Sequence, residues 1–132
     1  MAIQLSAAVR QSMIATYIAT VSTTPKLNFY SGTKPTATTS AATGTTLATL
    51  TLPSTWVTSA AGVTTIASGP WTGTGISAGT IGYFRLNDSA NTTVIEQGDV
   101  AVGSGDINLD NNVIAVGQTI SISTWTRTQG GA

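Results

Sequence analysis

The sequence predicts a mainly β protein with a single antiparallel domain, arranged as a sandwich or a small barrel, and one short helix at its N-terminus. About seven or eight short strand-like segments recur at intervals of roughly eight to twelve residues, bounded by Gly, Pro, Asn and Ser, as in sandwiches and barrels. The first segment of the chain instead repeats its apolar positions every four residues, which is helical spacing. A chain of 132 residues has room for one such core but not for two comfortable domains.

The N-terminal segment, residues 1–22, predicts a helix over about Ser6 to Thr20. Its apolar face comprises Leu5, Val9, Met13, Tyr17 and Val21, with Ile14 and Ile18 beside them. The opposite face carries Arg10, Gln11, Ser12 and Thr16. Pro25 ends the run, because the residue before a proline avoids the helical conformation. We expect this helix to pack on or extend from the β domain of residues 23–132, either capping an open face of its core or docking to a neighbouring subunit.

Four segments precede the centre of the chain. Strands are predicted at Lys26 to Tyr30, Thr45 to Leu52, around Trp56 and Val57, and at Gly62 to Ser68. Between the first two, residues 33–44 have no large apolar residue after Pro35 and no period, so we expect a flexible loop or a surface arm that becomes ordered against something else. Residues 69–75, GPWTGTG, are expected to break the strand pattern.

The stretch from Gly79 to Val102 predicts a central β-hairpin. Ile81, Tyr83 and Arg85 fall on one side of the first strand, while Phe84 and Leu86 fall on the other. The polar run 87–91 forms the turn, because Asn and Asp tolerate left-handed backbone. The chain returns through the β-branched residues 92–95, and we expect a bulge or turn at residues 98–99 before Val100 and Val102.

Three further strands are predicted after a chain reversal at residues 103–105. They cover Asp106 to Asp110, Val113 to Val116 and Gln118 to Thr128; in the last, Ile120 and Ile122 point one way, and Ser121, Ser123 and Trp125 the other. The expected core is made of the large apolar residues of all these strands. It comprises Leu27, Phe29, Leu50, Leu52, Val63, Ile66, Phe84, Leu86, Val94, Ile107, Leu109, Ile120 and Ile122.

The composition excludes several classes of function. Only 8% of residues are charged, and five basic side chains balance five acidic ones. The basic residues are scattered, so we expect no nucleic-acid partner, which would require clustered cations. The chain has no Cys and no His, which removes disulfides, thiolate nucleophiles, imidazole bases and the usual zinc sites. Polar residues interrupt the N-terminal apolar run, so we expect neither a signal peptide nor a membrane span. The uncharged surface favours a subunit that assembles.

Several short motifs resemble functional sites, but the surrounding sequence does not support those functions. Gly73, Gly75 and Ala78 match a dinucleotide-binding spacing, but a strand-like segment follows where a helix is required. Asp106, Asn108 and Asp110 match the first positions of a calcium loop, yet the later glycine and glutamate are missing. Glu96 and Asp99 could serve as an acid and base pair, but paired carboxylates are common on surfaces and nothing in the sequence places these two in a cleft. We therefore expect no catalytic residue, no cofactor and no metal.

The three tryptophans admit two interpretations. Trp56, Trp71 and Trp125 could form a carbohydrate-binding platform, but tryptophans this far apart in a sequence more often fill a core or an interface. The second interpretation is favoured.

Several segments resemble small virion proteins of tailed bacteriophages, and the likeness covers nearly the whole chain. Its most distinctive parts are FYSGTKP, ATGTTLATL, YFRLNDS and DINLDN. The resemblance implies a non-enzymatic particle component of β-sandwich or jelly-roll fold, such as a cement or decoration protein on the capsid lattice. A tail or head–tail junction component is the alternative, and a carbohydrate-binding adhesion module using Trp71 or Trp125 is a third.

A cement protein would bind the major capsid protein on the outside of the virion after synthesis in the bacterial cytoplasm. Self-association as a dimer or trimer is also expected, without nucleic acid or membrane as a partner. Interface candidates are Tyr17, Lys34, Trp71 and Arg85, because each places an aromatic or cationic group where the local pattern predicts exposure.

Overall fold

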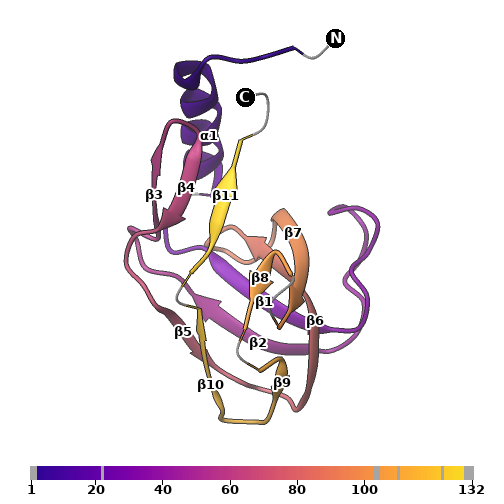
Figure 1. The fold of residues 1–132 in the computed structure, drawn as a ribbon. Coiled ribbons are helices and arrows are strands. Elements are labelled where there is room, and N and C mark those ends of the chain that lie inside the picture. Colours follow the sequence, from indigo (N-terminus) through magenta and orange to yellow (C-terminus); the bar gives the residue numbers. More distant parts are fainter. Residues whose placement is uncertain (1–2, 22, 103–104, 110, 123, 130–132) are drawn as a thin grey trace.

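The computed structural model describes residues 3–21, 23–102, 105–109, 111–122 and 124–129. Within them the chain forms one helix and eleven strands (Figure 1). They are α1 (Ala7–Val21), β1 (Lys26–Ser31), β2 (Thr46–Thr51), β3 (Val57–Ala60), β4 (Val63–Ile66), β5 (Trp71–Thr74), β6 (Gly79–Asn87), β7 (Val94–Ala101), β8 (Ile107–Asn108), β9 (Val113–Ile114), β10 (Thr119–Ile122) and β11 (Thr126–Thr128). The prediction of a mainly β, antiparallel fold with one N-terminal helix is confirmed.

The largest sheet has the strand order β2-β1-β6-β7-β8, and β9 pairs with the start of β6. The described pairs in it are antiparallel except β7 with β8, which is parallel. The predicted central hairpin is confirmed as β6 and β7, but the expected interruption at residues 98–99 is wrong. Gly98 pairs with Phe84, and a Cβ on Gly98 would lie 2.6 Å from the Phe84 ring. This glycine therefore makes room for a cross-strand aromatic side chain and does not end the strand.

Two smaller sheets complete the fold, with orders β10-β5 and β11-β4-β3. Strand β5 falls where the sequence predicted a break, so that expectation is wrong. A Cβ on Gly73 would lie 2.6 Å from Leu50 Cγ, so the glycine lets β5 cross close over β2. The predicted strand 118–128 divides into β10 and β11, which join different sheets. The alternation of Ile120 and Ile122 consequently does not extend to Trp125, and all three are buried.

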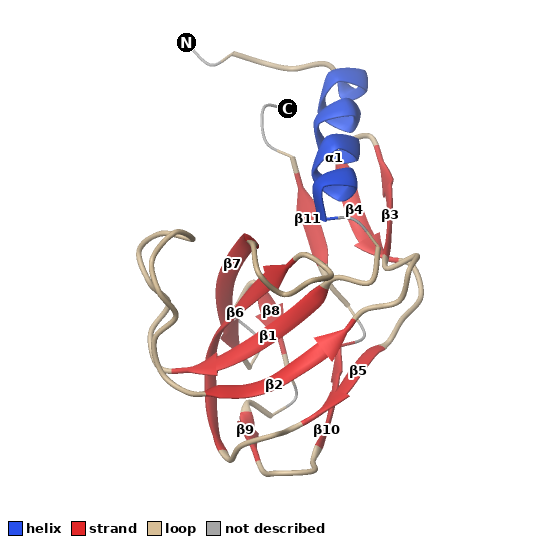
Figure 2. Cartoon of the chain, turned by 180° about the vertical axis from the view of Figure 1, so that it is seen from behind, coloured by secondary structure: helices blue, strands red, loops and turns tan. Residues whose placement is uncertain are grey.

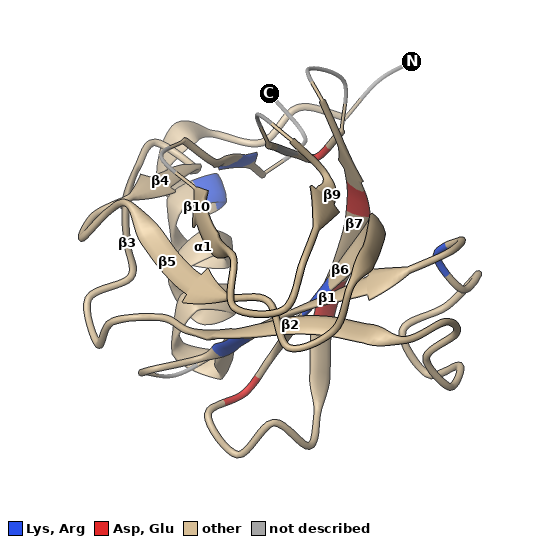
Figure 3. Cartoon of the chain, turned by 90° about the horizontal axis from the view of Figure 1, so that it is seen from below, with Lys and Arg blue, Asp and Glu red and all other residues tan. Residues whose placement is uncertain are grey.

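Strands β2, β5, β10, β9 and β6 surround a common apolar interior (Figure 3). Backbone hydrogen bonds link neighbours in this arrangement: the Ile76 amide donates to the Leu47 carbonyl at 2.8 Å, and the Gly75 amide donates to the Gln118 carbonyl at 2.8 Å. The β5–β10 ribbon thus packs as a second layer on the large sheet. Jelly-roll connectivity stays a prediction.

Most of the predicted core is confirmed. Buried members are Leu27, Phe29, Leu50, Leu52, Phe84, Leu86, Ile107, Leu109, Ile120 and Ile122. Val63, Ile66 and Val94 are only half-buried. In β4 the fully buried side chain is Thr64. Its cross-strand neighbours Ser59 and Arg127 both contact α1, so Thr64 lies on the face of the sheet that the helix covers. Asp110 and Ser123 of the predicted strands, and residues 103–104 of the predicted reversal, lie outside the described residues.

Helix α1 begins and ends within one residue of its predicted bounds, but its buried face differs from the prediction. Ile14 and Val21 are buried, whereas Val9 and Met13 are 47% and 42% exposed. Arg10 and Gln11, expected on the outer face, point to the β3–β4 turn. Arg10 Nη1 donates to the Ala61 carbonyl at 3.2 Å, and Gln11 Oε1 accepts from the Gly62 amide at 3.0 Å. The helix is turned about its axis relative to the prediction, because these two side chains satisfy backbone groups of the β3–β4 turn. It lies on one face of the β3–β4–β11 sheet (Figure 2).

Candidate binding surface

Arg85 is the most unusual side chain of the large sheet. It lies in the central strand β6 and is 4% exposed, although Arg is almost never fully buried without partners. Its Nη2 donates to the Ser40 carbonyl at 2.8 Å and more weakly to the Ala37 carbonyl at 3.5 Å. Its Nε donates to Gln97 Oε1 at 3.2 Å on the neighbouring strand. The guanidinium therefore holds the loop 33–44, which we call the arm, against the sheet.

Further contacts fix the arm at its beginning and end. Gln97 Nε2 donates to the carbonyl of the buried Pro35 at 2.9 Å. The Tyr83 hydroxyl donates to the Thr43 carbonyl at 2.6 Å and accepts from the Thr43 amide at 2.8 Å. Tyr83 stacks on Tyr30, with ring centroids 5.0 Å apart. Burial raises the pKa of Tyr30 above its ordinary value. Residues 33–44 were expected to form a flexible loop or an arm that becomes ordered against something else. In the structure, side chains of the adjacent sheet hold them.

The base of the arm is equally constrained. The Ser31 amide donates to the Thr45 carbonyl at 3.0 Å, and the Thr45 amide donates to Ser31 Oγ at 2.9 Å. Gly44 between them has φ +73°, and a Cβ there would lie 2.0 Å from the Ser31 carbonyl oxygen. Only glycine fits this position. The arm therefore leaves and re-enters the sheet through a closed neck.

The tip of the arm is a turn in which the Ser40 amide donates to the Ala37 carbonyl at 3.1 Å. Thr38 and Thr39 lie at its exposed end. Because Arg85 bonds the carbonyls of Ala37 and Ser40, it holds both ends of this turn. The result is a projecting, uncharged tip on a fixed support (Figure 2).

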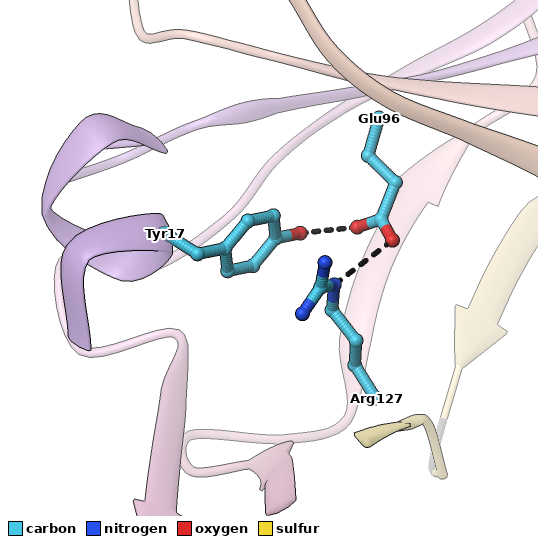
Figure 4. A network of polar contacts seen from close by, with 3 residues as sticks. All are labelled: Tyr17, Glu96 and Arg127. Carbon is cyan, nitrogen blue, oxygen red and sulfur yellow. Dashed lines mark hydrogen bonds and ion pairs between the residues drawn. The ribbon is translucent and has the colours of Figure 1, made fainter. Parts of the chain in front are cut away.

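A second polar site joins α1 to the sheets. Tyr17 from α1 donates to Glu96 Oε2 of β7, and Arg127 of β11 donates to Glu96 Oε1 at 3.0 Å (Figure 4). The Arg127 guanidinium carbon lies 4.0 Å from the Tyr17 ring centroid. Burial, followed by the charge of Glu96, raises the pKa of Tyr17 above its ordinary value. The phenol therefore stays protonated, and the three residues lock three elements together.

A groove of about 250 Å³ runs beside this lock, lined by Phe84, Gln97, Asp106, Trp125 and neighbours. Among the described residues, no group of three or more His, Cys, Asp or Glu side chains could hold a metal ion. Asp110, the third position of the calcium-like spacing, lies outside the described residues. The glycines of the dinucleotide-like motif lie at β5 and are followed by strand β6.

The three tryptophans lie together in the core. Trp56, Trp71 and Trp125 have ring centroids 5.5 to 6.0 Å apart, and Trp71 Nε1 donates to the Trp56 carbonyl at 3.3 Å. None is more than 8% exposed. The interpretation as core residues is confirmed, and Trp71 or Trp125 offers no indole face to a sugar ring. These rings fill the space where the three sheets meet.

The four predicted interface residues do not form one surface. Trp71 and Arg85 are buried, so the exposure expected of them is wrong. The tryptophan fills the core, and the arginine is covered by the arm. Tyr17 is half-buried and bonded within the chain, and Lys34 is half-buried at the start of the arm. Tyr83 and Gln97, which also hold the arm, were not predicted as contacts. For Tyr83 a signal existed, because strand alternation places it beside Arg85 on one face of β6.

Comparison with known protein families, with curated proteins and with solved structures finds no match. Across the described part of the chain, no helix combines the length and the apolar content that crossing a membrane requires.

Proposed function

We propose that this protein is a non-enzymatic structural component of a bacteriophage particle, and that it binds the outer capsid lattice through the arm and stabilises the assembled shell. The observation that carries the proposal is the arm held by the buried Arg85. Burying a guanidinium opposes folding through lost hydration, and here its hydrogen bonds go to carbonyls of a surface loop. A loop fixed in this way loses little further entropy when it binds.

The chemistry of the tip favours a protein surface as its partner. Thr36, Ala37, Thr38 and Thr39 are exposed and uncharged, so they can pack closely and exchange hydrogen bonds without desolvating ions. A ligand that binds only the assembled shell stabilises it by mass action. Repetition over a lattice lets many weak contacts act together.

The assignment to a bacteriophage rests on the resemblance of the FYSGTKP, ATGTTLATL, YFRLNDS and DINLDN segments. Two of these segments contain structural parts of the arm: FYSGTKP leads into it, and ATGTTLATL contains Gly44 of its neck. A tail or head–tail junction component is the second candidate, because the same fixed arm could serve there.

The test is binding of the purified protein to intact and to tail-free capsids, measured by sedimentation and imaged by electron microscopy. We expect many copies spread over the shell in both preparations. Copies confined to one vertex would establish the junction candidate, and no association with either particle would overturn the structural proposal. Retention of the isolated protein on glycans would instead favour an adhesion module.

Two matched variants locate the contact. Thr38→Lys places a charge at the tip of the arm and is expected to reduce capsid binding at least about tenfold, since an unpaired charge would be desolvated. Thr58→Lys makes the same change on the exposed strand β3 and should bind as the unmodified protein does. Equal loss in both variants would show that the arm is not the contact.

A further inference from the structure

Helix α1 has an unusual distribution of polar and apolar side chains. Its one charged residue, Arg10, is directed inward to the Ala61 carbonyl, and Gln11 is directed inward to Ser59 and Gly62. The exposed residues form what we call the outer face: Ala7, Ala8, Val9, Ser12, Met13, Ala15, Thr16, Ala19 and Thr20. A solvent-facing helix surface in a soluble protein ordinarily carries charged side chains. This outer face has none.

The hydroxyl donors of Ser12, Thr16 and Thr20 on the outer face already have hydrogen-bond acceptors within the helix. Ser12 Oγ donates to the Ala8 carbonyl at 3.2 Å, Thr16 Oγ1 to the Ser12 carbonyl at 3.1 Å, and Thr20 Oγ1 to the Thr16 carbonyl at 2.8 Å. Each donor is satisfied by the helix itself. Covering the face would therefore bury apolar surface, including the half-exposed Val9 and Met13, with only a small polar penalty.

We propose that the outer face of α1 packs against the outer face of a second copy of this chain, around a twofold axis. In a twofold interface the same surface meets itself, so any charge on it would approach its like. A charge-free face avoids this repulsion and is complementary to itself. The small residues Ala8, Ser12, Ala15 and Ala19 share one side and allow the two helices to approach closely, with Val9 and Met13 packing beside them.

Other occupants suit the face less well. Helices that lie on membranes carry Lys or Arg on their polar side, and α1 has no such residue free for lipid phosphates. The arm occupies a different part of the molecule, so pairing through α1 leaves both arms uncovered (Figure 2). At 15 residues the helix is roughly 22 Å long, which by itself gives an interface at the small end of the stable range. We therefore expect a weak dimer.

The first test measures association by sedimentation velocity over a concentration series. The unmodified chain should shift from monomer to dimer, and the double variant V9K/M13K should weaken the dimer at least about tenfold. Val116→Lys is the matched control, because Val116 is 70% exposed on the β9–β10 turn, far from α1 (Figure 1). A chain that stays monomeric at millimolar concentration, or a dimer weakened equally by the control, would overturn the inference.

The second test uses the absence of cysteine from the chain. A twofold axis near the helix midpoint brings residue 12 of the two copies, which lies on the stripe of small residues, close together. A disulfide forms only when the two Cα atoms are within about 7 Å. Ser12→Cys should therefore give a covalent dimer on mild oxidation, whereas Val116→Cys should not. Strong cross-linking of the second variant and none of the first would place the contact elsewhere and overturn the inference.

The dimer does not depend on the capsid proposal, and one comparison separates the two. V9K/M13K should still sediment with capsids at saturating concentration while remaining monomeric in solution. Thr38→Lys should dimerise normally while failing to bind capsids. Vesicle binding by the unmodified chain that V9K/M13K abolishes, without any dimer, would identify the face as a lipid contact and overturn the inference.

Discussion

The molecule has two regions that are stabilised in different ways. The body, made of β1, β2 and β5 to β10, surrounds a continuous apolar core that contains Phe29, Leu50, Phe84 and their neighbours. The upper module, made of α1, β3, β4 and β11, adds only a few residues, such as Val21 and Val57, to the same apolar cluster. It joins the body through the tryptophans and the Tyr17–Glu96–Arg127 lock. The free energy of apolar burial depends little on the direction from which side chains approach each other, whereas a hydrogen bond requires a defined direction. The difference suggests that the body determines stability and that the lock determines where α1 is presented.

The largest expected effect is in the body. Phe29→Ala removes a fully buried ring between β2 and β6 and should lower the free energy of unfolding by about 3–5 kcal/mol. Val9→Ala on the exposed side of α1 should change it by less than about 0.5 kcal/mol. Urea unfolding measures both. A small effect of Phe29→Ala would contradict the assignment of stability to the body.

The lock should have an intermediate effect, concentrated in the module. Glu96→Ala leaves the Tyr17 hydroxyl and the Arg127 guanidinium without their common acceptor and should lower the free energy of unfolding by about 2 kcal/mol. Glu96→Gln keeps the shape and an acceptor, so its loss should be smaller. Hydrogen exchange should show faster opening of α1 and β11 than of β6. Uniform acceleration across the chain would mean that the two regions unfold as one unit.

Alkaline pH should lower the free energy of unfolding through Tyr17. The pKa of Tyr17 is raised in the folded protein, so stability is fully present below the unfolded value of about 10 and declines above it, where only the unfolded chain loses the proton. At pH 11 the loss should be roughly 1 kcal/mol. Tyr17→Phe should remove most of this dependence and leave the part due to Tyr30, whose pKa is also raised. Thermal unfolding between pH 8 and pH 11 measures it, and an identical slope in the variant would contradict the role of Tyr17.

The smallest expected effect concerns the contact of α1 with the β3–β4 hairpin. Gln11→Ala removes hydrogen bonds to Ser59 and Gly62 and should lower the free energy of unfolding by about 0.5–1 kcal/mol. Ser12→Ala, one residue away on the outer face, should be close to neutral because its hydroxyl bonds only the helix. Chemical denaturation of the pair gives the difference. The reverse order would show that the outward face, and not the inward one, holds the helix.

The sequence predicted the parts of the fold that follow from local pattern. Alternation around Phe84 was enough to predict the β6–β7 hairpin, and the four-residue period was enough to predict α1. The rotation of α1 was not predictable, because the groups that attract Arg10 and Gln11 belong to a turn about fifty residues away in sequence. Strand β5 was missed because Gly73, which signals a break locally, is required by the close approach of Leu50.

The candidate site shows the same limit. Arg85 was chosen as an exposed contact, because it places a cationic group where the local pattern predicted exposure. Its acceptors are carbonyls of residues 37 and 40, which every residue type supplies and no motif marks. The residue types therefore identified Arg85 and the arm as candidate contacts. Only the folded backbone shows that they contact each other.

The placement of the basic residues affects how readily trypsin, which cuts after Lys and Arg, can cleave the folded protein. Arg85 is buried, and Arg10, Lys26, Lys34 and Arg127 are each only half-exposed. The arm, which projects most, has Lys34 as its one basic residue, and the bond that follows leads into Pro35, a junction that trypsin does not cut. The folded chain would thus resist tryptic digestion, and would be cut only when opening of the chain exposes the remaining sites.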